Sequence, residues 1–259
     1  MMNEDIKHDL IQSLSKNLRV DLRKNEDLRS IEIETGCVAT AEGSARVKFG
    51  DTEVIAGVKL AVEKPFPDTP EDAILMVASE MLPLSNPKYE GGPPGVDAIE
   101  MARVIDRSFR ESRCIETKKL CIQKGEKVWS IAIDIAPLND DGNLLDVGAF
   151  AALLALQNTV FPEYDGTKVL VDKKTTMKLP MVREPITVTV FKIGNAFVVD
   201  PTETEQTSFD ARMTFAILAD DKICSMQKGG DTAIMEEDLD IMLDIAIKTS
   251  QELRKKIPR

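Results

Sequence analysis

Several residue types are scarce in this sequence, and each absence excludes a class of site. Among 259 residues there is one histidine, His8, and the four cysteines form no CxxC pair, so the usual zinc ligand sets are missing. No apolar run approaches the roughly 18 residues that cross a bilayer. Residues 1–5 have neither the basic nor the apolar segment of a secretory signal. We therefore expect a cytoplasmic protein with buried free thiols, no membrane contact, no metal and no cofactor.

The short motifs of the commonest enzyme classes are also missing. The sequence contains no GxxxxGK[ST] phosphate loop, no GxGxxG, no HExxH and no GxSxG. The one glycine-rich stretch, 91–95, includes two prolines, which have no backbone N–H to offer to a phosphate. We interpret it as a stiff surface loop.

Positive charge is in the minority. The chain has 33 Lys and Arg residues against 44 Asp and Glu residues, for a formal net charge of −11. Proteins that bind nucleic acid over a broad surface are usually basic, so this balance argues against a large surface of that kind. Net charge averages over the whole molecule, so the argument does not extend to a local cluster of basic residues.

The hydrophobic pattern predicts an α+β protein. Apolar residues four apart (Ile6, Leu10, Leu14 and Leu18) predict an N-terminal helix over 4–18. Alternating residues predict a three-stranded antiparallel meander within 31–62. Similar patterns predict helices at 97–113, 145–159 and 236–256, and strands at 75–82, 119–123, 128–136, 168–171, 186–192, 196–200 and 211–219.

The order of these elements repeats along the chain. Strands followed by a helix occur three times, and runs of antiparallel strands followed by helices are typical of an α+β fold rather than a doubly wound parallel sheet. We expect an N-terminal helix and connector over 1–27, a first half over 28–162 and a second half over 163–259. The two halves are expected to form one compact unit.

The most informative cluster is a row of arginines, Arg103, Arg107, Arg110 and Arg113, on the expected helix 97–113. At about 100° per residue the first three lie within roughly 60° of one another, and Arg113 lies to one side. Guanidinium groups arranged in this way match phosphate oxygens in charge and geometry. The alternative is a solvated helix face whose arginines pair with neighbouring carboxylates. The opposite face should pack on a core through Ala98, Met101, Ala102, Ile105 and Phe109.

Acidic residues gather at the end of an expected strand. Asp200, Glu203, Glu205 and Asp210 include side chains able to bind Mg²⁺ or to act as acid and base. Such clusters arise easily in an acidic protein, so composition alone favours an ordinary surface here.

These segments together resemble the RNase PH family, and within it the non-catalytic ring subunits of the archaeal RNA exosome. The resemblance covers about residues 20–257 and implies two pseudo-repeated halves, each an antiparallel or mixed sheet packed with helices, of the ribosomal protein S5 domain 2-like type. The combination of stretches is specific, although each alone is weak. The matching stretches are 42–56, 79–87, 103–112, 140–146 and 199–205.

Departures from the family pattern bear on catalysis. Active members have a Gly-Ser-Arg turn that holds inorganic phosphate, where this chain has Gly142-Asn143-Leu144. Active members also have aspartates at the places that Gln206 and Arg212 occupy here by hand alignment. Gln cannot ionise and Arg repels a metal ion, so the resemblance implies no catalytic residue and no metal site in this chain. Asp210 is a possible displaced carboxylate.

The resemblance also implies partners. It predicts a hexameric ring, a trimer of heterodimers, in which this chain alternates with a catalytic RNase PH-like subunit and carries RNA-binding cap subunits on one face. In this arrangement Arg103, Arg107, Arg110 and Arg113 contact the backbone of RNA near its 3′ end. Two other interpretations remain open: an active phosphate-dependent 3′–5′ exoribonuclease using Asp200, Glu205 or Asp210, and a scaffold that does not touch RNA.

Overall fold

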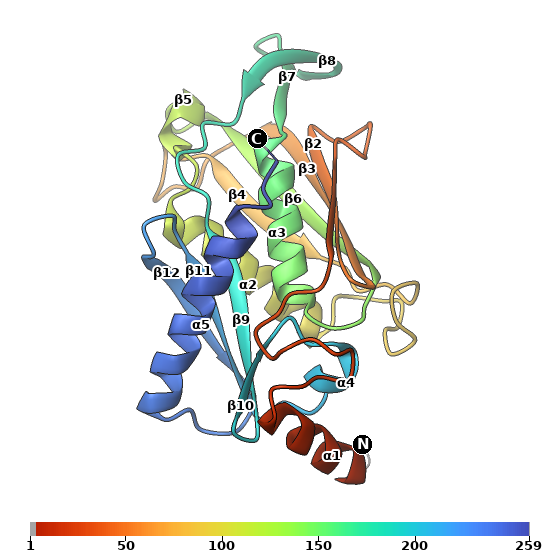
Figure 1. Ribbon diagram of the computed structural model, residues 1–259. Helices are drawn as coiled ribbons and strands as arrows, with labels where there is room; N and C mark the ends of the chain where they lie inside the picture. Colours follow the sequence, from red (N-terminus) through yellow and green to blue (C-terminus); the bar gives the residue numbers. More distant parts are fainter. Residues whose placement is uncertain (1–3, 259) are drawn as a thin grey trace.

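The larger of two main sheets is built by the first half of the chain (Figure 1). The computed structural model describes residues 4–258. The strand order is β1-β2-β3-β6-β4, with β5 paired to β6, and β4 alone runs parallel to its neighbour. Alternating apolar residues place one row of side chains in the core, as in β3, where every second residue from Thr52 to Leu60 is buried. The strands are β1 Ile31–Thr35, β2 Gly43–Phe49, β3 Thr52–Glu63, β4 Ile74–Ser79, β5 Cys121–Gln123 and β6 Lys127–Asn139.

The second half forms a four-stranded antiparallel sheet in the order β10-β9-β11-β12. Its strands are β9 Ile186–Ile193, β10 Ala196–Val199, β11 Ala211–Ile217 and β12 Ile223–Gly229. A separate two-stranded ribbon, β7 Val160–Tyr164 and β8 Val169–Lys178, projects at the top of Figure 1.

Helices fill the space between the sheets and cover them. The helix α3, Leu144–Gln157, is apolar almost all round and contacts strands of both sheets. The helix α2, Val96–Ser112, contacts β4 and β12, and α5, Glu236–Arg254, crosses in front of β9 and β11 (Figure 1). The remaining helices are α1 Glu4–Ser15, the 3₁₀ turn η1 Thr117–Leu120 and the short α4 Glu203–Gln206.

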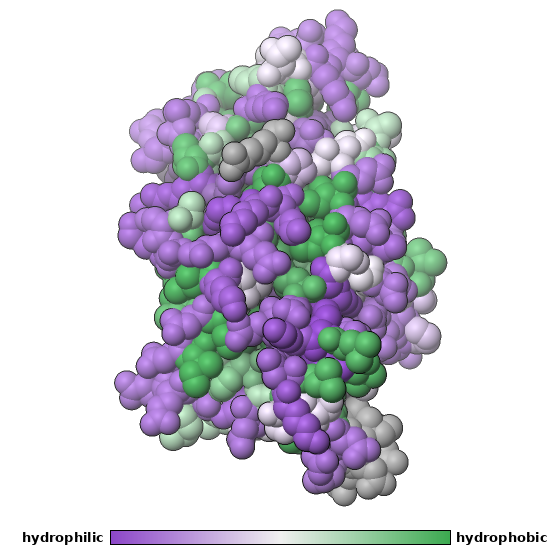
Figure 2. Space-filling model, in the orientation of Figure 1, coloured by the Kyte–Doolittle hydropathy of each residue, from purple (hydrophilic) through white to green (hydrophobic). Residues whose placement is uncertain are grey.

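One continuous hydrophobic core includes side chains from both sheets. The close approach of α2 to α3 depends on Gly148, because a Cβ there would lie 2.1 Å from the Met101 Cε. The surface seen in Figure 2 is mainly hydrophilic, with hydrophobic residues in separate patches. No helix in the described part of the chain is long and apolar enough to cross a membrane.

The α+β fold class and the meander are confirmed, and several elements differ from the prediction. The first helix ends at Ser15 rather than continuing to Leu18, because Asn17 turns the chain with a φ of 56°. Leu18 is consequently 46% exposed and does not join the buried Leu10 and Leu14. Among the cysteines, which are all free, only Cys114 is fully buried.

A fully buried carboxylate joins α3 to the second sheet. Asp146 on α3 accepts hydrogen bonds from the backbone N–H and the hydroxyl of Thr189 on β9, at 2.9 and 2.7 Å. That hydroxyl also lies 3.0 Å from the hydroxyl of Thr214. Burial raises the pKa of Asp146 to about 7, so in the folded protein this group keeps its proton far longer than in the unfolded chain.

Asp146→Asn should change how stability depends on pH. Between pH 3.8 and about 7 the folded protein binds a proton at Asp146 that the unfolded chain has released, so its contribution to stability falls as pH rises. Relative to the variant, the wild type should lose about 1.4 kcal/mol of unfolding free energy per pH unit in this window. Urea unfolding at several pH values measures the difference. A difference that stays constant from pH 4 to 8 would show that Asp146 is ionised throughout.

Candidate nucleic-acid interface

The arginine row lies on the exposed side of α2. The helix begins after Gly95 and ends at Arg113, which adopts a left-handed conformation with a φ of 51°. Met101, Ile105 and Phe109 are buried beneath it together with Ala98, whereas Ala102 is only half-buried. Arg113 is therefore the capping residue beyond the last turn, a correction to its placement on the helix.

The four arginines are all exposed but differ in their contacts. Arg107 Nη1 donates to Gln227 Oε1 on β12 at 3.1 Å. Arg110 binds both oxygens of Asp106, at 2.7 and 3.1 Å, and donates to the carbonyl of Leu75. Within the described chain, the side chains of Arg103 and Arg113 make no hydrogen bond or ion pair. Two arginines of the row thus have no partner in the described chain, Arg107 has one hydrogen bond to an amide, and Arg110 is paired with a carboxylate of its own helix.

Two hollows lie along this row. Arg103 and Arg107 line a hollow of about 650 Å³ that also includes Val96, Ile99 and Gln227. Arg110 and Arg113 line another, of about 680 Å³, at the C-terminal end of α2. The row therefore connects two recesses large enough for parts of an extended ligand.

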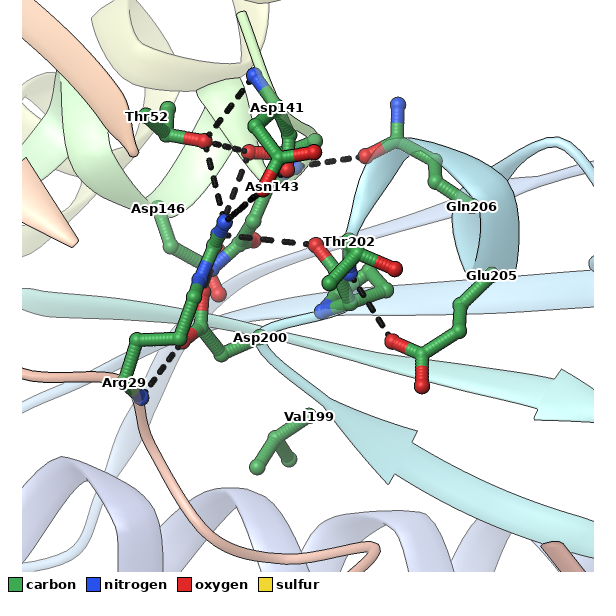
Figure 3. A network of polar contacts seen from close by, with 12 residues as sticks. Arg29, Thr52, Asp141, Asn143, Asp146, Val199, Asp200, Thr202, Glu205 and Gln206 are labelled. Carbon is green, nitrogen blue, oxygen red and sulfur yellow. Dashed lines mark hydrogen bonds and ion pairs between the residues drawn. The ribbon is translucent and has the colours of Figure 1, made fainter. Parts of the chain in front are cut away.

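The turn before α3 holds its own polar groups internally (Figure 3). Asn143 is 1% exposed, and its side-chain N–H donates to Asp200 Oδ1 at 2.9 Å. Gly142 has a φ of 85° and packs so tightly that a Cβ would lie 2.5 Å from the Pro201 carbonyl. Leu144 is 7% exposed and joins the core. Neither Asn143 nor Leu144 presents a side chain to solvent as a phosphate ligand would require.

Gln206 and Arg212 lie in one hollow with this turn. The hollow has a volume of about 320 Å³ and is lined by Asn143, Gln206, Arg212, Glu100 and Lys88, among others. Gln206 Oε1 accepts a hydrogen bond from the backbone N–H of Asn143 at 2.6 Å, so a neutral amide covers the start of α3 (Figure 3). Arg212 pairs with Glu100 of α2 at 2.8 Å. Both groups are engaged within the chain.

Three arginines of residues 19–29, the connector between α1 and β1, bind the carboxylates that follow β10. Arg29 Nη2 lies 2.7 Å from Asp200 Oδ1 and Arg23 Nη1 lies 3.3 Å from Asp200 Oδ2. Arg19 Nε lies 2.9 Å from Glu205 Oε1 with both side chains buried. Burial alone raises the pKa of Asp200, but the hydrogen bonds and charges of Arg29 and Arg23 outweigh it and hold this pKa below its usual value.

The other two carboxylates of the cluster, Asp210 and Glu203, bind different partners. Asp210 binds Lys7 at 2.9 Å and the backbone N–H of Gly194 at 2.7 Å. Burial raises its pKa, and these two partners together lower it below the usual value. Glu203 accepts a hydrogen bond from Asn86 at 2.8 Å. Across residues 4–258, no group of three His, Cys, Asp or Glu side chains converges as a metal site would.

The connector arginines are functional neighbours of the site that sequence reasoning missed. Arg29 also donates to the carbonyls of Asp141 and Gly142, at 2.9 and 3.3 Å, and so holds the turn in shape (Figure 3). The only signal was the presence of three arginines in a connector beside an unusual number of downstream carboxylates.

Two sheets with the α3 turn and the strand-end carboxylates at their junction define a protein of RNase PH type. The 3′ exoribonuclease family, domain 1, matches residues 27–162, and domain 2 of the same family matches residues 184–249. The chain belongs to this family.

Its relatives are described as exosome components. Exosome complex component Rrp42 of Archaeoglobus fulgidus is 42% identical over 253 residues, which cover 97% of this chain and 96% of the relative. Exosome complex component Rrp42 of Sulfurisphaera tokodaii is 40% identical over 257 residues, covering 98% and 93%.

Solved structures agree with this grouping. A chain of the Archaeoglobus fulgidus exosome with RNA bound to the active site superposes with a TM-score of 0.90 at 39% identity, covering 98% of both chains. A chain of an archaeal exosome core gives 0.86 at 37% identity, covering 98% of this chain and 96% of the other. Rice Rrp46, at 16% identity and a TM-score of 0.70, shares the fold.

Proposed function

We propose that this chain is a non-catalytic subunit of an archaeal-type exosome, in the cytoplasm. In this proposal it alternates with a catalytic RNase PH-like subunit in a ring made as a trimer of heterodimers, below RNA-binding cap subunits. Support comes from relatives named as exosome components that match nearly the whole chain. We propose that residues 1–27 form the N-terminal helix and connector, and that 28–162 and 163–259 form the two RNase PH-like halves.

The observation that carries the non-catalytic role is that each of these side chains at the degenerate site bonds to another group of this chain, although the buried Asn143 Oδ1 has no partner among the described residues. Asn143 is turned toward Asp200, and Gln206 is bonded to the Asn143 amide. Arg212 is paired with Glu100. Asp200 and Glu205 are neutralised by arginines of this chain, so neither is free to bind a metal or to move a proton.

The exposed face of α2 supports contact with RNA. Arg103 lies beside the hollow of about 650 Å³ and has no competing carboxylate partner in the described chain. Guanidinium contacts to phosphates supply affinity without sequence choice, which suits the binding of many RNAs near their 3′ ends. We propose that Arg103, Arg107 and Arg110 contact the RNA backbone, with Arg113 at the end of the row.

The assembly is tested by co-expression with a catalytic RNase PH-like homologue from the same source. Native mass measurement of the purified complex should give a hexamer with three copies of each chain. The same measurement on this chain alone is the control and should give no hexamer. A ring made only of this chain, or no stable association with the homologue, would contradict the proposed assembly.

A further inference from the structure

The hollow at the C-terminal end of α2 is a preformed groove. One wall is the loop that leads into β4, and the other is the segment from Arg113 to Lys119. Two hydrogen bonds tie the walls together: the Thr117 hydroxyl to Asp72 at 2.9 Å and the Ala73 N–H to the Thr117 carbonyl at 3.2 Å. Arg110 of α2 also donates to the Leu75 carbonyl of β4 at 3.0 Å. A ligand entering this groove would therefore meet walls that are already ordered.

The groove carries a local excess of positive charge in an acidic protein. Its lining includes Arg110, Arg113, Lys118 and Lys119 against two carboxylates, Asp72 and Glu116. Glu116 pairs with Lys119, and Asp72 accepts from Thr117. Neither Arg113 nor Lys118 forms an ion pair within the described residues, although the charge of Lys118 helps to lower the pKa of Glu71 after the larger effect of Lys124. Both cations of the lining are therefore available to a ligand.

Phe66 lines the groove with an exposed aromatic side chain. It is 58% exposed, whereas the other large apolar side chains of the lining are buried or half-buried. Pro65 and Pro67 flank it, and a backbone hydrogen bond from the Thr69 N–H to the Phe66 carbonyl at 3.1 Å closes the turn. The ring is therefore presented on a stiff loop, which lowers the entropy lost on binding.

Cations beside an exposed aromatic ring form the usual arrangement for binding single-stranded nucleic acid, since phosphates pair with the cations and a base stacks on the ring. We propose that single-stranded RNA occupies this groove, with a base on Phe66 and phosphates at Arg113 and Lys118. The inference rests on the proposed contact between RNA and α2, and extends that contact beyond the arginine row. A protein partner is a poorer match, because the groove offers a single exposed apolar side chain among charged ones.

The test uses Phe66→Ala and Phe66→Trp in the reconstituted ring with the catalytic homologue. Binding of a fluorescent single-stranded RNA is measured across a range of salt concentrations. Phe66→Ala should weaken binding about tenfold at every salt concentration, because stacking involves no counterion release. Phe66→Trp should retain wild-type binding. Lys118→Gln should instead reduce the salt slope by about 0.7.

Met177→Ala serves as the matched control, since Met177 is a similarly exposed apolar residue (53%) on the projecting β8. It should leave binding unchanged. Equal affinities for Phe66→Ala and the wild type would overturn the proposal that RNA binds in the groove. The proposed contact between RNA and α2 would still stand if the arginine variants lose affinity. Loss of the ring itself in Phe66→Ala would also overturn the groove proposal, because Phe66 would then be a subunit contact.

Discussion

Replacing Arg29 with methionine should lower the free energy of unfolding by about 3–5 kcal/mol, the usual cost of removing one partner from a buried ion pair. The Arg29 side chain is 7% exposed and Asp200 is 0% exposed. Without the Arg29 guanidinium, the carboxylate keeps the backbone N–H of residue 29 at 2.8 Å, the weaker contact with Arg23 at 3.3 Å and the amide of Asn143. Urea unfolding at pH 7, followed by circular dichroism, measures the loss.

The pH dependence of this loss identifies its cause. The wild-type pKa of Asp200 is lowered, so the ion pair stabilises the fold above the unfolded pKa of about 3.9 and this stability disappears as pH falls through the folded value. In Arg29→Met, burial dominates and raises that pKa, so the difference from wild type should shrink in acid. Adding Asp200→Asn should recover part of the loss at pH 7. Lys124→Met, which removes an exposed ion pair with Glu71, is the control and should leave the unfolding midpoint unchanged.

An unchanged unfolding midpoint in Arg29→Met would contradict the structural role of this pair. The carboxylates after β10 would then be available for chemistry after all. That outcome would reopen the interpretation of the chain as an active exoribonuclease.

Replacing Arg103, Arg107 and Arg110 together with alanine should weaken RNA binding by the assembled ring and flatten its dependence on salt. Each lost phosphate contact reduces the slope of log K against log salt by about 0.7 for a single strand, so three contacts account for about 2. The affinity should fall most at low salt, and KM for RNA should rise. Binding titrations at several salt concentrations measure both effects.

A charge-matched control separates local contact from net charge. Lys173, Lys222 and Lys248 are 65%, 76% and 73% exposed and lie on other elements of the chain. Changing these three to alanine alters the net charge equally and should leave the slope unchanged. Equal slopes for the wild type and the arginine variant would favour a scaffold without RNA contact.

Much of the fold was predictable because its core strands and helices have strong periodic patterns. In β6 the alternation of Ile131, Ile133 and Ile135 marks the buried row directly. The arginine row was equally readable, since helical spacing alone places Arg103, Arg107 and Arg110 on one side of α2. The conformation of Arg113 was missed because a helix end depends on its cap.

Elements with little buried surface were missed. The strand β12 was not predicted, and it has no fully buried side chain. The strand β8 extends from 169 to 178 rather than ending at 171, because most of the side chains of β8 are exposed and no alternation marks them. The pairing of Arg29 with Asp200, separated by 171 positions in the chain, was also missed. The sequence shows the arginines of the connector but not which carboxylates they meet, and only the folded arrangement brings the connector beside β10.

The most direct test of the central claim is the release of nucleoside diphosphates from a single-stranded RNA in the presence of inorganic phosphate and Mg²⁺. The purified chain alone should release none, whereas the same chain assembled with its catalytic homologue should support release. The ring carrying the arginine variant should release them with a raised KM. Release of nucleoside diphosphates by the purified chain alone would contradict the account.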